Sequence, residues 1–263
     1  MPTRLGAVTY LNARPLVFGI EAHADRFSVR FDIPSQCSRL LHARAVDVGL
    51  IPSIEYVHGP EYRIVPEVAV ASNGPVASVA LFTARPMSSV RTIAADTSSR
   101  TSVALLRVLC ARRFRIDPEI RPMDPDVTIM LERCDAALVI GDPALFLDHA
   151  ALGVRKIDLG EEWKALTGLP FVYAFWAGWA DALGPEDVAV LREVKRAGAA
   201  HPEEVARAYF GAGEDERVAI GTRYLREHVT FDLGEPEQKG LRRFYAYAAE
   251  LGLAPADTTL RFY

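Results

Sequence analysis

The chain has few cysteines, and they form no recognisable site. Its 263 residues include three, Cys37, Cys110 and Cys134, which are widely separated and show no C-x-x-C spacing. Zinc sites and disulfide frameworks need paired or clustered cysteines, so neither is expected, and a reducing compartment fits this pattern best. We therefore expect a protein that works without a metal ion, and nothing else in the sequence calls for a cofactor.

Long apolar runs and targeting signals are also missing. No run is long enough to span a membrane. The N-terminal stretch MPTRLGAVTYLNARPLVFGI is interrupted by Asn12, Arg14 and Pro15 and lacks a small-residue cleavage signature. This pattern predicts a strand and a turn of the fold, so a cytoplasmic protein without membrane contact is expected.

An excess of positive charge is absent as well. The chain has 30 basic and 34 acidic residues, a net charge of −4, and no sustained block of Lys and Arg. Neutralising phosphate groups needs a basic face, so a nucleic-acid partner is not expected. There is no internal repeat and no low-complexity linker. Half of the residues are hydrophobic, and a chain of this length can bury roughly three quarters of its unfolded surface.

Segments of strand and helix character alternate along the chain. The β-rich runs RLGAVTYL, SVRFDI and DVGLIP are separated by NARPLVFGIEAHAD and PSQCSRLLHARA, which have helical spacing. This order predicts a βαβαβ unit, and a second such unit begins near residue 88. After Pro185 the pattern is helical, so these last helices should cover a sheet formed earlier.

Two α/β units in this order predict two lobes, with the second inserted into the first. We expect residues 1–84 and 175–263 to form the first lobe and residues 85–174 the inserted lobe. Open α/β sheets bind ligands beyond the carboxyl ends of their strands, here in a cleft between the lobes. The predicted strand ends supply five small or polar candidates: Asn12, Ser53, Ser78, Gly141 and Asp142.

The stretch DTSSRTS, residues 96–102, has more hydroxyl groups than a helix start needs. One or two side chains suffice to cap a helix, for which Asp96 and Thr97 are candidates. The others lie where free amides and the helix dipole favour an anion. Arg100 at a helix start opposes the dipole, so an acidic partner rather than a ligand is an alternative. The candidate anion ligands are Thr97, Ser99, Arg100, Thr101 and Ser102.

Six segments in order resemble the motifs of one enzyme family, the chorismate dehydratases of the futalosine route to menaquinone. They are RLGAVTYLNARPLVFGIE, IPSIEY, ASNGPVASVALF, ADTSSRTSVALLRVL, DAALVIGDPAL and DLGEEWKALTGLPFVYAFWA. The resemblance covers nearly the whole chain. It implies the two-lobed α/β fold of type II periplasmic binding proteins, with an inserted second lobe, and chorismate as the substrate.

The dehydration of chorismate sets chemical requirements for this site. Negative charge that develops in the ring can spread onto the ring carboxylate, which the TSSRTS segment could bind. The enolpyruvyl carboxylate needs a second anchor, for which Asn12 with Ser78 or Ser53 is suited. Asn12 and Ser78 are the catalytic candidates, and Tyr173 is the one aromatic residue we place in the ring site.

A dedicated base is harder to find. No histidine falls at a predicted strand end, and Asp142 in GDPA is a better helix cap than a base. We therefore hypothesise that the substrate's own enolpyruvyl carboxylate takes the proton. A cytosolic solute-binding protein or a sister enzyme of the same pathway is the alternative, because this fold also serves binding. The sequence does not specify the oligomeric state.

Overall fold

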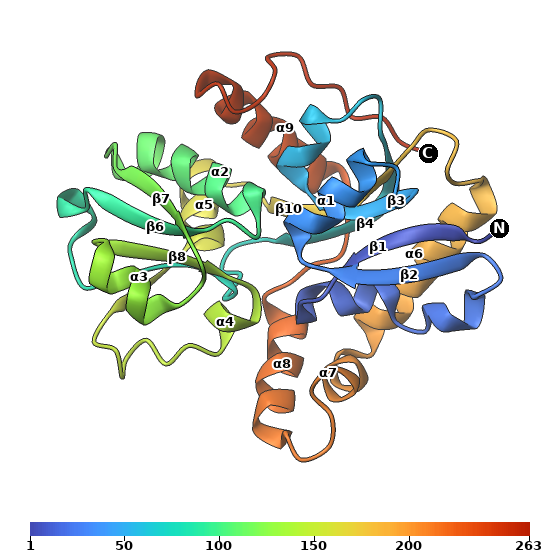
Figure 1. Ribbon diagram of the computed structural model, residues 1–263, viewed down its shortest axis with the longest axis horizontal. Helices are drawn as coiled ribbons and strands as arrows, with labels where there is room; N and C mark the ends of the chain where they lie inside the picture. The colour runs from blue at the N-terminus through green and yellow to red at the C-terminus, as the bar shows by residue number, and fades with distance from the viewer.

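The computed structural model describes residues 1–263 and arranges them around two five-stranded sheets (Figure 1). The first sheet has the order β2-β1-β3-β10-β4, with strands β1 (Thr3–Val8), β2 (Phe27–Asp32), β3 (Val48–Pro52), β4 (Arg63–Ser72) and β10 (Phe171–Gly178). The second has the order β7-β6-β8-β5-β9, with strands β5 (Val79–Thr83), β6 (Thr92–Asp96), β7 (Glu119–Met123), β8 (Ala136–Ile140) and β9 (Arg155–Asp158). Each sheet forms one lobe.

Both sheets follow one plan. In the first, β1 pairs in parallel with β2 and β3, and β10 runs antiparallel between β3 and β4. In the second, β6 pairs in parallel with β7 and β8, and β5 runs antiparallel between β8 and β9. Parallel strands place their carboxyl ends at one edge of a sheet. Residues at or just after the ends of β1, β3, β6 and β8 meet in one cavity between the lobes.

The helices surround these sheets. The α-helices are α1 (Pro34–His42), α2 (Arg100–Leu109), α3 (Val127–Arg133), α4 (Gly141–Leu145), α5 (Leu159–Thr167), α6 (Pro185–Ala200), α7 (Pro202–Phe210), α8 (Asp215–Glu227) and α9 (Glu235–Glu250). Shorter helical turns are η1 (Leu11–Val17), η2 (Ile20–His23), η3 (Ser53–His58), η4 (Met87–Ser89) and the π-helical η5 (Cys110–Phe114). No helix combines the length and apolarity needed to cross a bilayer.

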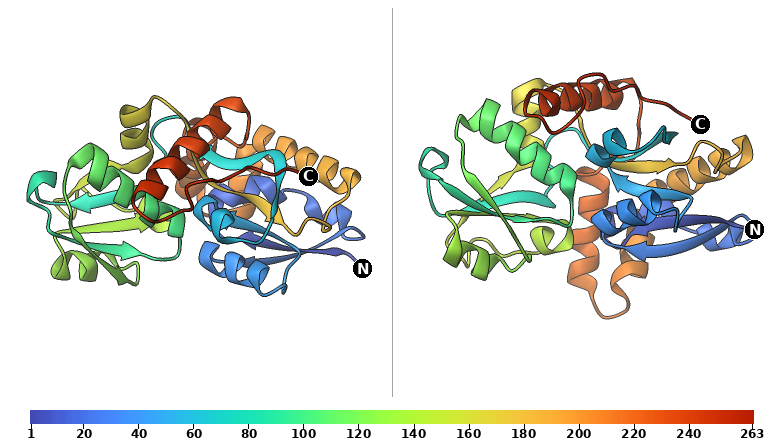
Figure 2. Two further views of the ribbon diagram at one scale, coloured as in Figure 1. Left: turned by 90° about the horizontal axis from the view of Figure 1, so that it is seen from above. Right: turned by 45° about the horizontal axis from the view of Figure 1, so that its top comes forward.

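The last helix joins the two lobes. Helix α9 contacts β10 of the first lobe and α2 of the second, and Figure 2 shows it lying over the junction. The largest apolar cluster likewise contains Ile51 and Phe171 from the first sheet and Leu81 from the second. The lobes are therefore held by a shared core as well as by the chain crossings.

The chain crosses between the lobes earlier than the sequence predicts. The expected boundaries were residues 85 and 175, but Val79–Thr83 pairs entirely within the second sheet and Phe171–Gly178 entirely within the first. The chain crosses between the lobes in the short segments that directly precede β5 and β10. An apolar strand looks the same in either sheet, so only the pairing partners decide to which lobe it belongs.

The segment after β1 also differs from expectation. Helical spacing over residues 12–25 predicted a helix, but the chain forms the two 3-10 turns η1 and η2. Pro15 lies inside η1 and cannot donate a backbone hydrogen bond, and Gly19 between the turns has φ +73°. This irregular path places Tyr10 and Asn12 at the cavity.

Candidate active site

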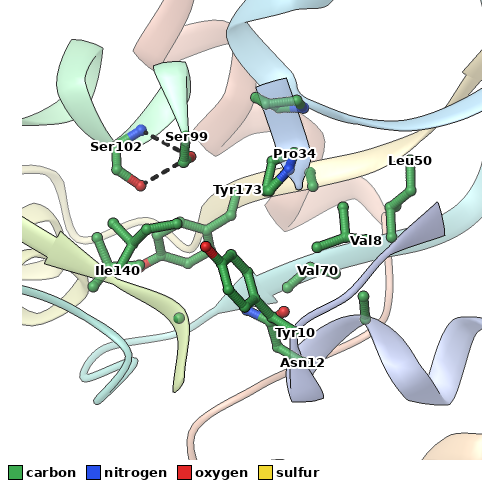
Figure 3. Close-up of a pocket in the computed structure, with 15 residues that line it drawn as sticks. Val8, Tyr10, Asn12, Pro34, Leu50, Val70, Ser99, Ser102, Ile140 and Tyr173 are labelled. Carbon is green, nitrogen blue, oxygen red and sulfur yellow. Dashed lines mark hydrogen bonds between the residues drawn. The ribbon is translucent and has the colours of Figure 1, made fainter. Parts of the chain in front are cut away.

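A cavity with about 460 Å³ of empty space lies between the lobes (Figure 3). It is lined by Val8, Tyr10, Asn12, Ala13, Pro34, Leu50, Pro52, Val70, Val79, Ser99, Ser102, Ile140, Gly141, Tyr173 and Ala174. Nine of these residues are hydrophobic, and this empty space includes solvent at the open mouth of the cavity. The walls can enclose an apolar ring, with polar contacts at a few defined points.

The lining contains no His, Lys, Arg, Asp or Glu. Its polar side chains are Tyr10, Asn12, Ser99, Ser102 and Tyr173. Burial raises the pKa of Tyr10 above its ordinary value and that of Tyr173 well above it, so both phenols are neutral near pH 7. A carboxylate in this cavity would meet neutral donors, and no side chain of the lining is suited to act as a base.

Two serines at the start of α2 offer the best-defined donor. The backbone N–H and the hydroxyl of Ser102 both donate to Ser99 Oγ, at 3.4 and 3.1 Å (Figure 3). Ser99 is the N-cap of α2, and both side chains are almost fully buried at the cavity. Because Ser99 Oγ already accepts two bonds, its own proton is free to be donated to a ligand. The dipole of α2 adds to the preference for an anion.

The rest of DTSSRTS does not reach the cavity. Thr97 is exposed and lines a separate surface groove. Thr101 is fully buried, and its Oγ1 accepts a bond from the backbone N–H of Ile54 at 3.0 Å. Arg100 forms an ion pair with the buried Glu55 at 2.8 Å, so the acidic-partner alternative is the correct one. Thr97, Arg100 and Thr101 therefore do not line the cavity, and their contact with a ligand stays a prediction.

The cap of α2 is Ser99 rather than Asp96 or Thr97. Asp96 instead accepts a bond from the backbone N–H of Ser98 at 2.8 Å, while its second oxygen is buried without a partner. Burial raises the pKa of this carboxyl group. The helix starts later than expected, because the residues from Asp96 to Ser98 form a turn that brings Ser99 to the cavity.

Replacing Thr101 by valine should reduce stability, with little change in any activity. The substitution leaves the buried Ile54 N–H without its acceptor, which typically costs about 1–3 kcal/mol. Thr222→Val is the control, because the Thr222 hydroxyl only donates to Val218 within α8. Urea unfolding of both variants measures the difference. Equal stability of the two would contradict this role of Thr101.

Two other serines expected at the site form hydrogen bonds to other parts of the protein. Ser53 is completely buried, and its hydroxyl donates to the carbonyl oxygen of Val172 at 2.8 Å. Ser78 is also buried, and its Oγ lies 2.6 Å from the hydroxyl of Tyr224. Neither serine lines the cavity. In this arrangement of the lobes both hydroxyls are bonded to groups of the protein, and contact of Ser53 or Ser78 with the substrate stays a prediction.

Asn12 and Tyr173 do line the cavity. Asn12 is half-buried and enters from η1, directly below Tyr10 in Figure 3. The ring of Tyr173 forms part of the wall, while its hydroxyl lies 3.2 Å from Ser72 Oγ. Tyr173 thus combines a core position with one face toward the cavity.

Gly141 and Asp142 begin α4 at the end of β8. Gly141 lines the cavity with φ +67°, and a Cβ there would lie 3.0 Å from the ring of Tyr10. The Asp142 carboxylate points away and does not cap α4. It accepts bonds from the backbone N–H of Leu11 and from the hydroxyl of Tyr209, both in the first lobe. Asp142 therefore links the lobes and does not line the cavity.

Most residues of the cavity wall were not predicted as site residues from the sequence. Tyr10 packs against Gly141, and its hydroxyl lies 3.4 Å from Ser98 Oγ. Pro34 and Pro52 close other parts of the wall. Tyr10 stands between a strand end and Asn12, so its position in the sequence was a usable signal. The apolar wall residues had no such signal, because they look like ordinary core residues.

Comparisons with known proteins agree with the resemblance read from the sequence. Residues 3–250 match the model of a family described as menaquinone biosynthesis. The chain is 30% identical over 272 residues to a chorismate dehydratase of Thermus thermophilus, covering 96% of each chain. It is 26% identical over 246 residues to a chorismate dehydratase of Campylobacter jejuni, covering 93% of each.

Solved structures with the same fold have more distant sequences. Protein AF1704 from Archaeoglobus fulgidus has a TM-score of 0.74 at 19% identity and covers 95% of this chain and 97% of its own. The periplasmic aliphatic sulphonate binding protein SsuA from Escherichia coli has a TM-score of 0.63 at 17% identity, covering 97% and 88%. The predicted α/β fold of periplasmic binding proteins is confirmed.

Proposed function

The chain belongs to the menaquinone biosynthesis family, and from this we propose that it is a chorismate dehydratase, a hydro-lyase. The product would be 3-(1-carboxyvinyloxy)benzoate. The observation that carries the proposal is the full-length similarity to two relatives of that name, one of them 30% identical. The cavity between the lobes supports it, because an apolar wall with a few neutral hydrogen-bond donors suits a small cyclic carboxylate.

The proposed reaction removes one water molecule from the ring of chorismate. The C–H bond beside the enolpyruvyl ether breaks, and its electron pair forms the new ring double bond. At the same time the C–O bond to the hydroxyl group on the neighbouring ring carbon breaks. The enolpyruvyl carboxylate takes the proton of the C–H bond and returns it to the hydroxyl group, which leaves as water, so atoms and charge balance. Aromatisation drives the reaction. In the transition state, negative charge spreads through the ring onto its carboxylate, where fixed donors lower the barrier.

Each substrate carboxylate has a donor in the cavity. The ring carboxylate would accept the free proton of Ser99 at the positive end of α2. The enolpyruvyl carboxylate would lie against the amide of Asn12, which enters from the other lobe. The ring would pack between Tyr10 and the apolar wall. A substrate held at both ends in this way spans the two lobes and keeps one geometry.

The proton acceptor in this proposal is the substrate itself. The cavity lining has no basic side chain, and the Asp142 carboxylate is occupied by Leu11 and Tyr209. The enolpyruvyl carboxylate is attached next to the C–H bond that breaks, so it can reach the proton. The role of the enzyme is then to hold that carboxylate in place and to exclude water.

The direct test is to mix the purified protein with chorismate. The diene absorbance of chorismate should fall, and mass spectrometry should find a product lighter by one water molecule. A solute-binding protein would bind chorismate or another carboxylate without consuming it. Binding without turnover, measured by calorimetry on the same sample, would therefore favour the binding alternative.

Asp142→Asn should retain turnover to within about tenfold of the original rate, equivalent to about 1.4 kcal/mol, because the Asp142 carboxylate takes no part in the proposed reaction. Asparagine keeps an oxygen that can accept from Leu11 or Tyr209, so the link between the lobes is only weakened. Steady-state kinetics and product binding by calorimetry check this expectation. Complete loss of turnover with unchanged product binding would identify Asp142 as the base and overturn the substrate-assisted mechanism.

A further inference from the structure

We propose that Ser72 is a positioning residue whose hydroxyl group holds the ring of Tyr173 in the cavity wall. This inference deepens the proposed function and rests on it, because the substrate ring would pack against that wall. Ser72 is the last residue of β4, is 1% exposed and does not line the cavity. Tyr173 lies on β10 and lines the cavity (Figure 3). Ser72 can therefore act on a bound ligand only through Tyr173.

Tyr173 occupies an irregular position in β10. Val172 pairs with Ala71 of β4 in the antiparallel register. The next pair joins Ala174 to Val70, so Tyr173 is the extra residue of a β-bulge. A bulge interrupts the regular ladder and re-aims the side chain that it carries. The strand pairing therefore does not fix the direction of this ring, and side-chain contacts have to do so.

The hydrogen bond between Tyr173 and Ser72 has one favoured direction. The Tyr173 hydroxyl lies 3.2 Å from Ser72 Oγ and has no other hydrogen-bond partner. The Ser72 hydroxyl donates its single proton to the carbonyl oxygen of Gly74 at 3.0 Å, and a carbonyl oxygen can only accept. Ser72 Oγ is thus left as the acceptor for the Tyr173 proton. The reverse direction would leave that buried proton without an acceptor, which is unfavourable.

The second lobe closes the space around this contact. A Cβ at Gly160, the second residue of α5, would lie 2.7 Å from the Tyr173 hydroxyl oxygen and 2.8 Å from Ser72 Oγ. The same Cβ would lie 2.5 Å from the carbonyl oxygen of Gly74. Gly160 is itself fixed, because its N–H donates to Asp158 at 2.9 Å. The phenol therefore has no room to turn toward α5.

The open side of the Tyr173 ring is the cavity. Burial raises the pKa of Tyr173 well above its ordinary value, so the phenol keeps its proton in the neutral range. Without Ser72 as its acceptor, this proton would have to find another partner, and the ring can move for that purpose only toward the cavity. The Ser72 hydroxyl thus keeps the ring in the wall and out of the space that the substrate needs.

The test is Ser72→Ala, which removes the acceptor and leaves the Tyr173 phenol intact. We expect kcat/KM to fall at least ~10-fold, equivalent to about 1.4 kcal/mol, because the ring leaves the position against which the substrate packs. Ser38→Ala is the matched control. Ser38 is fully buried, and its hydroxyl only donates to the carbonyl oxygen of Pro34 within α1. No other side chain bonds to it, so kcat/KM of this variant should equal that of the wild type.

Adding Tyr173→Phe to Ser72→Ala separates positioning from general damage. The double variant has no phenol proton to satisfy, so the ring can return to the wall and most of the lost kcat/KM should be regained. Two independent defects would instead lower kcat/KM further. A double variant no more active than Ser72→Ala, or a Ser72→Ala protein with wild-type kcat/KM, would overturn the role of Ser72.

A further readout does not depend on turnover. In protein with isotope-labelled tyrosine, the ring signals of Tyr173 in an NMR spectrum can be assigned by their loss in Tyr173→Phe. They should shift in Ser72→Ala but not in Ser38→Ala, and unshifted signals in Ser72→Ala would contradict the proposal. Failure of the wild type to consume chorismate would instead overturn the proposed function, while the NMR result would still decide whether Ser72 positions the ring.

Discussion

Replacing Asn12 by aspartate should nearly abolish chorismate turnover and leave the protein folded. The two side chains have almost the same shape, but aspartate brings a negative charge to a cavity proposed to hold two carboxylates. At 4 Å, two like charges repel by about 4 kcal/mol near a protein surface, which corresponds to a loss of roughly 1,000-fold. Steady-state kinetics and a thermal melt of the same preparation measure both parts of this expectation.

The chain offers a matched control for that substitution. Asn73 is exposed outside the cavity, and its amide oxygen accepts a bond from Lys164 at 2.7 Å. Asn73→Asp makes the same change of shape and charge beside a positive group, so turnover should match the wild type. If Asn12→Asp lost stability and activity together, Asn12 would be a structural turn residue, a role that its position after a strand also permits.

Gly141→Ala should have the second largest effect on activity. At φ +67° a Cβ carries a strain of roughly 1–2 kcal/mol. The new Cβ would also lie 3.0 Å from three atoms of the Tyr10 ring, which must move. Because Tyr10 and Gly141 both line the cavity, the displaced ring would change the position of the substrate. Small displacements of this kind can lower kcat/KM on the order of 100-fold.

Gly153→Ala separates backbone strain from the contact with Tyr10. Gly153 has φ +64°, and nothing lies within 4 Å of the position that its Cβ would take. In urea unfolding, Gly153→Ala should lose the stability that backbone strain costs, and Gly141→Ala at least as much, but only Gly141→Ala should lose activity. Equal kinetics in the two variants would mean that the Tyr10 ring adapts without consequence. In that case the cavity would be less tightly defined than its contacts indicate.

Local patterns in the sequence were sufficient for the fold class. Alternating apolar strands and capped helices predict two α/β units, because hydrophobic periodicity and helix caps act within a few residues of one another. Open α/β sheets bind ligands beyond the carboxyl ends of their strands. This rule identified Asn12, Ser99, Ser102 and Gly141 as candidates, and all four line the cavity. Position after a buried strand is a property of the sequence, so these residues could be found without a structure.

Only the tertiary structure decided which polar side chains face the cavity and which bond to other residues of the protein. Thr101 directly precedes Ser102 in the chain, yet it accepts a bond from the backbone of η3 while Ser102 lines the cavity. The sequence could not separate them, because adjacent residues of a helix point in directions about 100° apart and the helix start was itself shifted. The links made by Arg100, Asp142 and Tyr224 likewise join residues 45 to 146 positions apart in sequence. Such partners meet only after the lobes have packed, and no local pattern encodes them.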